Sequence, residues 1–313
     1  MTRNRFWKRL AWFAGVFFLL LNLFCAWHAW KFTHFTDTAA PRTNPNRLSA
    51  FGKLKTVVLG VDNPRPVNKG VPPVPYETIT LQSDFPLEAW LVRTPHAKGT
   101  VVLFHGYSGK KSSMIDRAMI LRGLGVNTLL VDFRGSGGSG GNYTTVGFQE
   151  ARDVKAAYDY LRKSGEPNIW LLGTSLGAAA VLKAVKDGGV EPKGVILEAP
   201  FATLYEATCA RFRAVNAPEF PFAGMVVFWG GAIHGFWGFG HQPMEDARAA
   251  KMPALVLYGE KDERVERWEI DAVFENLGGR KELVTFPGAG HVNFLSRHRP
   301  EWTAALREFI RTE

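Results

Sequence analysis

Cysteine is scarce in this 313-residue chain, which has two, Cys25 and Cys209. One lies in an apolar run near the N-terminus and the other far away in the globular part, so neither an intrachain disulfide nor a cysteine-bound metal is expected. After residue 75 an excess of basic over acidic side chains is also missing. Residues 1–75 hold 11 of the 38 Lys and Arg and 2 of the 29 Asp and Glu, which leaves 27 of each for residues 76–313. A nucleic-acid-binding face needs a basic patch on the folded body, so we expect no nucleic-acid partner.

Charged residues are absent from Leu10 to Trp30, where most positions are Leu, Phe, Ala, Val or Trp. As a helix, this run of 21 residues spans roughly 30 Å, the thickness of the hydrocarbon core of a bilayer. A cleaved signal peptide usually has a shorter apolar stretch with a small-residue cleavage site close behind it, and a buried core helix is the other alternative. We predict a transmembrane anchor at 10–30 that follows a basic tail at 1–9.

The four basic residues before the anchor favour a cytoplasmic N-terminus, which puts the rest of the chain outside, in the periplasm of a bacterium. Lys31, Arg42 and Arg47 follow the anchor and weaken this bias. We expect a single-pass protein of the inner (plasma) membrane. Seven prolines then interrupt residues 31–75, so we predict an irregular, partly extended spacer there with no regular helix.

Short apolar runs alternate with helix-like stretches over 76–313. Such alternation predicts an α/β fold with a mostly parallel, eight-stranded sheet covered by helices on both faces. The predicted strands are 77–83, 86–93, 100–104, 127–133, 169–172, 194–197, 254–258 and 283–286. Ligands bind such sheets at the carboxyl ends of the strands, so the residues that follow each strand carry the functional argument.

Residues 173–177 read Gly-Thr-Ser-Leu-Gly, directly after a predicted strand and before a predicted helix. In this context the Gly-x-Ser-x-Gly pattern is typical of a nucleophile elbow, a sharp turn that tolerates only tiny residues two before and two after the serine. The helix that follows directs its amino-terminal dipole at the developing oxyanion. The alternative is an ordinary glycine-rich turn. We predict that Ser175 is a catalytic nucleophile.

A serine nucleophile needs a base, and His291 lies between the last predicted strand and the last helix, where the base is expected. The acid that orients this histidine should follow the penultimate strand. Asp262 is our choice, and Glu260, Glu263 and Glu198 remain alternatives.

The oxyanion needs two backbone N–H donors. We expect one from Leu176, which follows the nucleophile, and one from Tyr107 in the turn 104–109. In the same turn His105 is expected to stabilise the backbone and not to serve as a second base.

Two glycine-rich segments imitate phosphate-binding loops. Residues 135–140 match Gly-x-Gly-x-x-Gly but open no helix, and Asp132 beside them would repel a pyrophosphate. Residues 109–112 lack the spacing of a phosphate loop and are interpreted as a solvated helix start. His234 and His241 have no further metal ligands near them. The sequence therefore predicts neither a cofactor nor a metal.

With His-Gly at 105–106, the elbow at 173–177, and Asp262 and His291 in this order, residues 76–313 resemble the α/β-hydrolase superfamily. The run that begins at Asp132 is similar to a segment found after the fourth strand in many members. The Glu-Ala-Pro-Phe run at 198–201 and the Pro-Gly-Ala-Gly-His run at 287–291 are similar to the membrane-anchored branch of lysophospholipases, acyl-protein thioesterases and serine aminopeptidase-like proteins. The resemblance implies a Ser-His-Asp triad.

A segment at about 202–250 is longer than the connections of roughly 2–6 residues usual in such folds, and we predict a lid there. Phe228, Trp229 and Trp237 are candidates for lining a substrate site, with plain packing of the lid as the alternative. We expect hydrolysis of a small-molecule or lipid ester or thioester. The competing hypotheses are a serine peptidase of aminopeptidase type and a non-catalytic, membrane-tethered binding protein.

Overall fold

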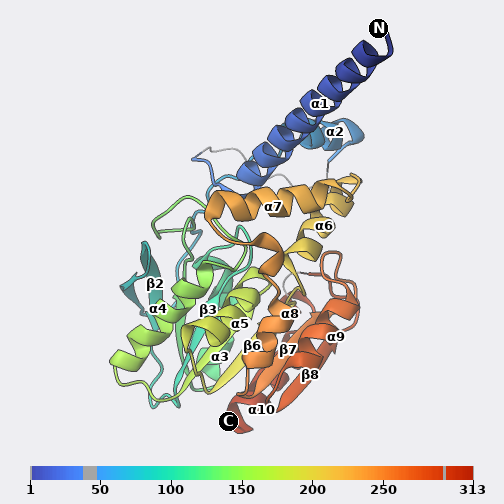
Figure 1. Cartoon of the computed structure of the whole chain (residues 1–313). Coiled ribbons are helices and arrows are strands. Elements are labelled where there is room, and N and C mark those ends of the chain that lie inside the picture. The colour runs from blue at the N-terminus through green and yellow to red at the C-terminus, as the bar shows by residue number, and fades with distance from the viewer. Residues whose placement is uncertain (1, 38–47, 292–293, 313) are drawn as a thin grey trace.

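The computed structural model describes residues 2–37, 48–291 and 294–312 (Figure 1). An eight-stranded sheet with the order β1-β2-β4-β3-β5-β6-β7-β8 forms its centre. β1 pairs antiparallel with β2 and β2 with β4, while every other neighbouring pair is parallel, which confirms the predicted sheet. The strands are β1 (Glu77–Gln82), β2 (Pro86–Val92), β3 (Thr100–Phe104), β4 (Asn127–Val131), β5 (Ile169–Thr174), β6 (Gly194–Glu198), β7 (Ala254–Gly259) and β8 (Lys281–Phe286).

Helices cover both faces of the sheet, because successive side chains of each strand point to opposite sides. In β3, Val101 and Leu103 belong to the core cluster that includes α3 and α10, whereas Val102 and Phe104 belong to the cluster that includes α4, α5 and α9. The covering helices are α3 (Ile115–Gly123), α4 (Glu150–Lys163), α5 (Leu176–Gly188), α8 (Pro243–Asp246), α9 (Arg267–Asn276) and α10 (Arg299–Thr312), with short 3₁₀ turns at η2 (Lys111–Met114), η3 (Gly238–Gly240), η4 (Ala247–Ala249) and η5 (Phe294–Ser296).

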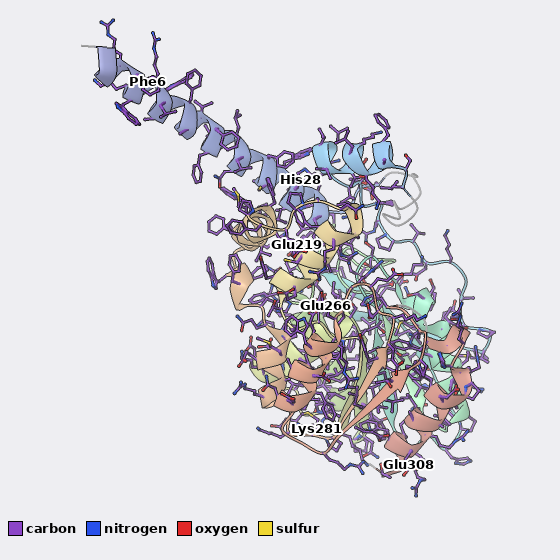
Figure 2. All side chains as sticks on the ribbon, turned by 90° about the vertical axis from the view of Figure 1, so that its right-hand side faces the viewer. Phe6, His28, Glu219, Glu266, Lys281 and Glu308 are labelled. Atoms are coloured by element: carbon purple, nitrogen blue, oxygen red, sulfur yellow. The ribbon has the colours of Figure 1, made fainter. Side chains whose placement is uncertain are left out.

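The N-terminal helix α1 (Thr2–Thr33) projects from this body (Figure 1). Its segment Arg5–Thr33 is long and apolar enough to cross a membrane, and only 6% of its most apolar window is buried in the protein. Figure 2 shows Phe6 far from the body and His28 where α1 joins it. At that junction Cys25 and Ala29 are buried against Val226 of α7 (Phe222–His234), so α1 is packed into the domain at one end and exposed at the other.

A second helix, α2 (Ala50–Leu59), lies beside α1, and the prediction that the spacer contains no regular helix is wrong for these residues. The prolines at 45 and 64 leave the residues between them free of proline, so a helix fits there. Ser49 caps its start by accepting a hydrogen bond from the Gly52 N–H (3.2 Å), and Gly60, with φ of 78°, ends it. The expectation of a spacer at 38–47 lies outside the described residues.

Two helices of the predicted lid segment, α6 (Leu204–Val215) and α7, lie between β6 and β7 and pack against each other. α7 crosses beneath the end of α1 in Figure 1. We use the name lid for α6 and α7.

Asp132 and Arg134, which follow β4 directly, each form a buried ion pair that holds this loop in place. Lys111 is fully buried and pairs with Asp132 and Glu88, so the interpretation of 109–112 as a solvated helix start is wrong for this residue. Arg134, also fully buried, pairs through Nη2 with Oδ1 of the equally buried Asp153 at 2.7 Å. The glycine-rich run 135–140 folds over these charges, since the Gly138 N–H donates to Asp132 (3.0 Å). This packing explains the glycines without a bound phosphate.

Arg134→Met should lower the free energy of unfolding by about 3–5 kcal/mol, because it leaves the Asp153 carboxylate buried without its partner. Urea unfolding of the full chain in detergent, followed by circular dichroism, measures this loss. Arg267→Met removes one side of an exposed pair with Asp271 and should cost less than about 1 kcal/mol. Equal losses in the two variants would contradict the assignment.

Candidate active site

Ser175 occupies a strained turn between β5 and α5. Its φ of 53° and ψ of −110° lie in a region that non-glycine residues rarely adopt. A hydrogen bond from the Ser175 N–H to the Glu198 carbonyl (2.7 Å) holds the turn. A Cβ on Gly173 would come within 2.4 Å of the Gly177 backbone, and one on Gly177 within 2.5 Å of the Phe104 oxygen. Both glycines are therefore required, as expected of a nucleophile elbow.

His291 and Asp262 are joined by a hydrogen bond of 2.8 Å between Nδ1 and Oδ2. The Asp262 side chain is fully buried, and its other oxygen accepts the N–H groups of Arg264 (2.8 Å) and Val265 (3.0 Å). These bonds fix the carboxylate, which in turn orients the imidazole. A neutral His291 that donates from Nδ1 has Nε2 as its basic nitrogen.

The other candidate acids make different contacts. Glu198 is buried below the elbow, where it pairs with Arg117 (2.8 Å) and accepts hydrogen bonds from Trp302 Nε1 (2.9 Å) and the Thr174 hydroxyl (2.7 Å). Glu260 accepts from the Thr285 hydroxyl (3.0 Å). Asp262 is thus hydrogen-bonded to His291, whereas Glu198 supports the turn that carries Ser175.

The turn after β3 lies against the elbow, since a Cβ on Gly106 would be 3.3 Å from the Thr174 oxygen. His105 is buried in this turn, with Nδ1 bonded to the Gly106 carbonyl (2.8 Å) and Nε2 accepting the Phe133 N–H (3.2 Å). Burial lowers the pKa of His105, so its imidazole stays neutral and serves the backbone, as predicted. Leu176 is the first residue of α5, where helical N–H groups have no intrahelical acceptor.

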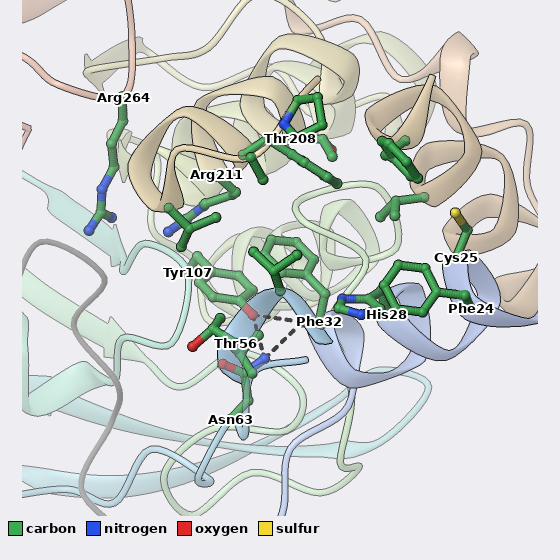
Figure 3. A pocket seen from close by; sticks show the side chains of 18 residues that line it. Phe24, Cys25, His28, Phe32, Thr56, Asn63, Tyr107, Thr208, Arg211 and Arg264 are labelled. Atoms are coloured by element: carbon green, nitrogen blue, oxygen red, sulfur yellow. Dashed lines mark hydrogen bonds between the residues drawn. The ribbon is translucent and has the colours of Figure 1, made fainter. Parts of the chain in front are cut away.

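Tyr107, the other expected oxyanion donor, is bound to the end of α1. Its hydroxyl donates to the Phe32 carbonyl (2.6 Å) and accepts from Asn63 Nδ2 (2.6 Å), and its ring stacks on Phe32 with centroids 4.9 Å apart (Figure 3). Sequence reasoning missed this link. Residues 32 and 107 lie 75 positions apart, and no local pattern encodes such a contact.

A cavity of about 540 Å³ opens between α1, α2 and the lid (Figure 3). Its lining residues include Tyr107, from the turn after β3, and Arg264, two residues after Asp262, but not Ser175 or His291. The size lies within the roughly 300–1,000 Å³ usual for small-molecule sites. Among the residues that the structure describes, no group of three or more His, Cys, Asp or Glu is placed to hold a metal.

The three lid aromatics expected at the substrate site are not among the lining residues of this cavity. Trp229 donates from Nε1 to Asn22 of α1 (3.2 Å), whereas Phe228 and Trp237 are exposed. On α7, Phe222 and Val226, four residues apart on one face, line the cavity, whereas Trp237 follows the end of this helix.

Glu198→Gln should destabilise the protein by about 3 kcal/mol, because the change leaves the buried Arg117 without its counter-charge. Urea unfolding of the full chain measures the loss. Glu260→Gln, at an exposed site, is the control and should change stability by less than about 0.5 kcal/mol. A Glu198 variant as stable as this control would show that the pair does not support the elbow.

Comparisons with known proteins agree with the fold. The family described as "Serine aminopeptidase, S33" matches residues 95–224. The uncharacterised protein Rv2307c of Mycobacterium tuberculosis is 30% identical over 206 residues, 63% of this chain and 66% of that protein, which is just under two thirds of its length. Protein bem46 of Schizosaccharomyces pombe is 24% identical over 220 residues, 69% of this chain and 68% of that protein.

Among solved structures, the Pyrococcus furiosus esterase Pf2001 superposes with a TM-score of 0.66 and 23% identity over 80% of this chain and 96% of its own. A likeness at this identity shows the fold alone. The sheet order, the strained serine between β5 and α5, and this superposition lead to one conclusion: this chain has the α/β-hydrolase fold.

Proposed function

We propose that this protein is a membrane-anchored serine hydrolase that cleaves a carboxylic ester or thioester through an acyl-enzyme at Ser175. The observation that carries the proposal is the 2.8 Å bond between His291 and a buried Asp262, at the carboxyl edge of the sheet that also holds the elbow serine. A histidine oriented by a fixed carboxylate is the arrangement that activates a serine.

In the proposed reaction, the Ser175 Oγ attacks the substrate carbonyl while His291 Nε2 takes its proton. The N–H groups of Tyr107 and Leu176 stabilise the oxyanion of the tetrahedral intermediate. His291 then protonates the leaving alcohol or thiol, and an acyl group remains on the serine. Water deprotonated by His291 releases the acid. Asp262 fixes the imidazole tautomer and stabilises the imidazolium at each step.

Peptidase activity is the second candidate, because the matched family is described as a serine aminopeptidase. An aminopeptidase needs an acidic side chain near the substrate's ammonium group. The described residues that line the cavity include no Asp or Glu, but they include Arg211 and Arg264. This charge favours a neutral or anionic substrate, and therefore an ester or thioester over an amino-terminal peptide.

The anchor is part of the proposal. The end of α1 contributes Cys25 and Ala29 to a buried cluster and the Phe32 carbonyl to Tyr107, which supports a retained helix over a cleaved signal sequence. The exposed remainder is long enough to span a bilayer. Four basic residues before it favour a cytoplasmic N-terminus, so we infer that the catalytic domain faces the outer, periplasmic side.

Ser175→Ala and His291→Ala should each reduce turnover of a short p-nitrophenyl ester by ~10⁴–10⁶-fold, because each removes a member of the triad. The assay uses the full chain in detergent, with Ser164→Ala at an exposed, remote site as the control. A fluorophosphonate should label the wild type and the control, but not the Ser175 variant. Near-full activity in either triad variant would end the proposal, and an unlabelled wild type would favour a non-catalytic binding protein.

Asp262→Asn should reduce turnover by about 10⁴-fold, because an amide no longer stabilises the imidazolium and favours the wrong tautomer of His291. The matched control is Glu260→Gln in the same loop, expected to retain wild-type turnover. An unchanged rate in Asp262→Asn would assign the orienting role to another acid.

A further inference from the structure

We propose that the N-terminal helix is itself part of the substrate site, because one face of α1 forms a wall of an acyl-chain cavity that receives membrane lipids directly from the bilayer. The inference rests on the proposed hydrolase function and names its substrate class, a long-chain acyl ester or thioester. The helix then has two roles, attachment and recognition.

The first argument is the composition of the cavity wall. Phe24, Cys25, His28 and Phe32, which lie along one face of α1, line the cavity of about 540 Å³. The lid supplies apolar side chains opposite them, including Phe212, Phe222 and Val226, and α2 supplies Thr56 and Val57. A mainly apolar space of this size, bounded by a helix that leaves the protein surface, fits a flexible hydrocarbon chain.

The second argument is the polarity of the cavity along its length. Figure 3 places Tyr107 and Arg211 towards one end, next to the candidate oxyanion turn, and Phe24 and Cys25 at the other. The Arg211 guanidinium stacks 4.9 Å from the centre of the Tyr107 ring. An amphiphile with its carbonyl at the Tyr107 end and its chain towards Phe24 matches this gradient.

The third argument is the surface that surrounds the cavity. α2 has no buried residue, and it exposes Phe51, Leu54 and Val58 beside α1. Exposed apolar side chains in such number mark an interaction surface, and here it is continuous with a helix fit to span a membrane. Trp27 and Trp30, at the domain end of α1, are residues that favour the bilayer interface. The cavity-lining face of α1 therefore lies at the depth of lipid carbonyls.

The test measures how chain length affects kcat/KM for the full chain in phosphatidylcholine vesicles, with p-nitrophenyl esters from acetyl to palmitoyl. In the wild type, each added methylene should raise kcat/KM by up to about fourfold until the cavity is filled. His28→Trp narrows the cavity from α1, so it should lower the palmitoyl value at least tenfold and leave the acetyl value within twofold. Leu23→Trp, on an exposed face of the same helix, should leave both values unchanged. Equal effects of the two variants, or an equal loss for the acetyl and palmitoyl esters in His28→Trp, would overturn the inference.

A second measurement needs no variant. A fluorophosphonate with a dodecyl chain and a terminal diazirine is attached to the wild type and irradiated, and the crosslinked peptides are identified by mass spectrometry. Crosslinks to residues 24–32 of α1 support the inference. Crosslinks confined to other segments overturn this inference and leave the proposed function standing. Failure of the probe to label Ser175 overturns the proposed function and, with it, this inference.

Discussion

The strained backbone at Ser175 is the constraint on which the rest of the site depends. A non-glycine residue in this region costs on the order of 1–3 kcal/mol, and it persists only where the surroundings hold it. Here β5 and α5 approach so closely that Gly173 leaves no room for a Cβ, and the end of β3 leaves none at Gly177. The Glu198 carbonyl accepts a hydrogen bond from the serine amide. The side chain of Glu198 extends the support, because it binds Arg117 and Trp302 from the helices of one face. The buried ion pair between Glu198 and Arg117 thus supports the backbone that places Ser175 at the carboxyl end of β5.

The turn after β3 is constrained from two directions. His105 accepts a hydrogen bond from the Phe133 N–H in the loop after β4, and the Tyr107 hydroxyl donates one to the Phe32 carbonyl of α1. Asn63 makes the second connection, because its amide donates to the carbonyls of Lys31 and Phe32 as well as to Tyr107. The backbone that we assign to the oxyanion is therefore positioned by the same hydrogen bonds that dock the N-terminal helix.

The sheet and the elbow were predictable because their signals are local. Strands buried on both faces read as continuous apolar runs, and the elbow glycines stand two residues before and two residues after the serine. The choice between Asp262 and Glu198 was not predictable, since both follow strands and only side-chain direction separates them. The proline content of the whole spacer argued against any helix there, although no proline falls between 45 and 64, where α2 forms. The cavity was beyond sequence reasoning, since its wall joins α1 to a lid about 200 residues away.

The contacts of α1 determine how much of the domain would stay ordered without this helix. Removing the helix would take away the acceptor of the Tyr107 hydroxyl and two acceptors of the largely buried Asn63 amide. It would also expose Val226 and its neighbours on α7. Buried polar groups without partners cost about 1–3 kcal/mol each. One of these groups, the Tyr107 hydroxyl, belongs to the turn that lies against the elbow. A free domain would therefore lose order first at the candidate oxyanion site. Because the same contacts form only when the helix is in place, docking of α1 and ordering of the turn after β3 are one structural event.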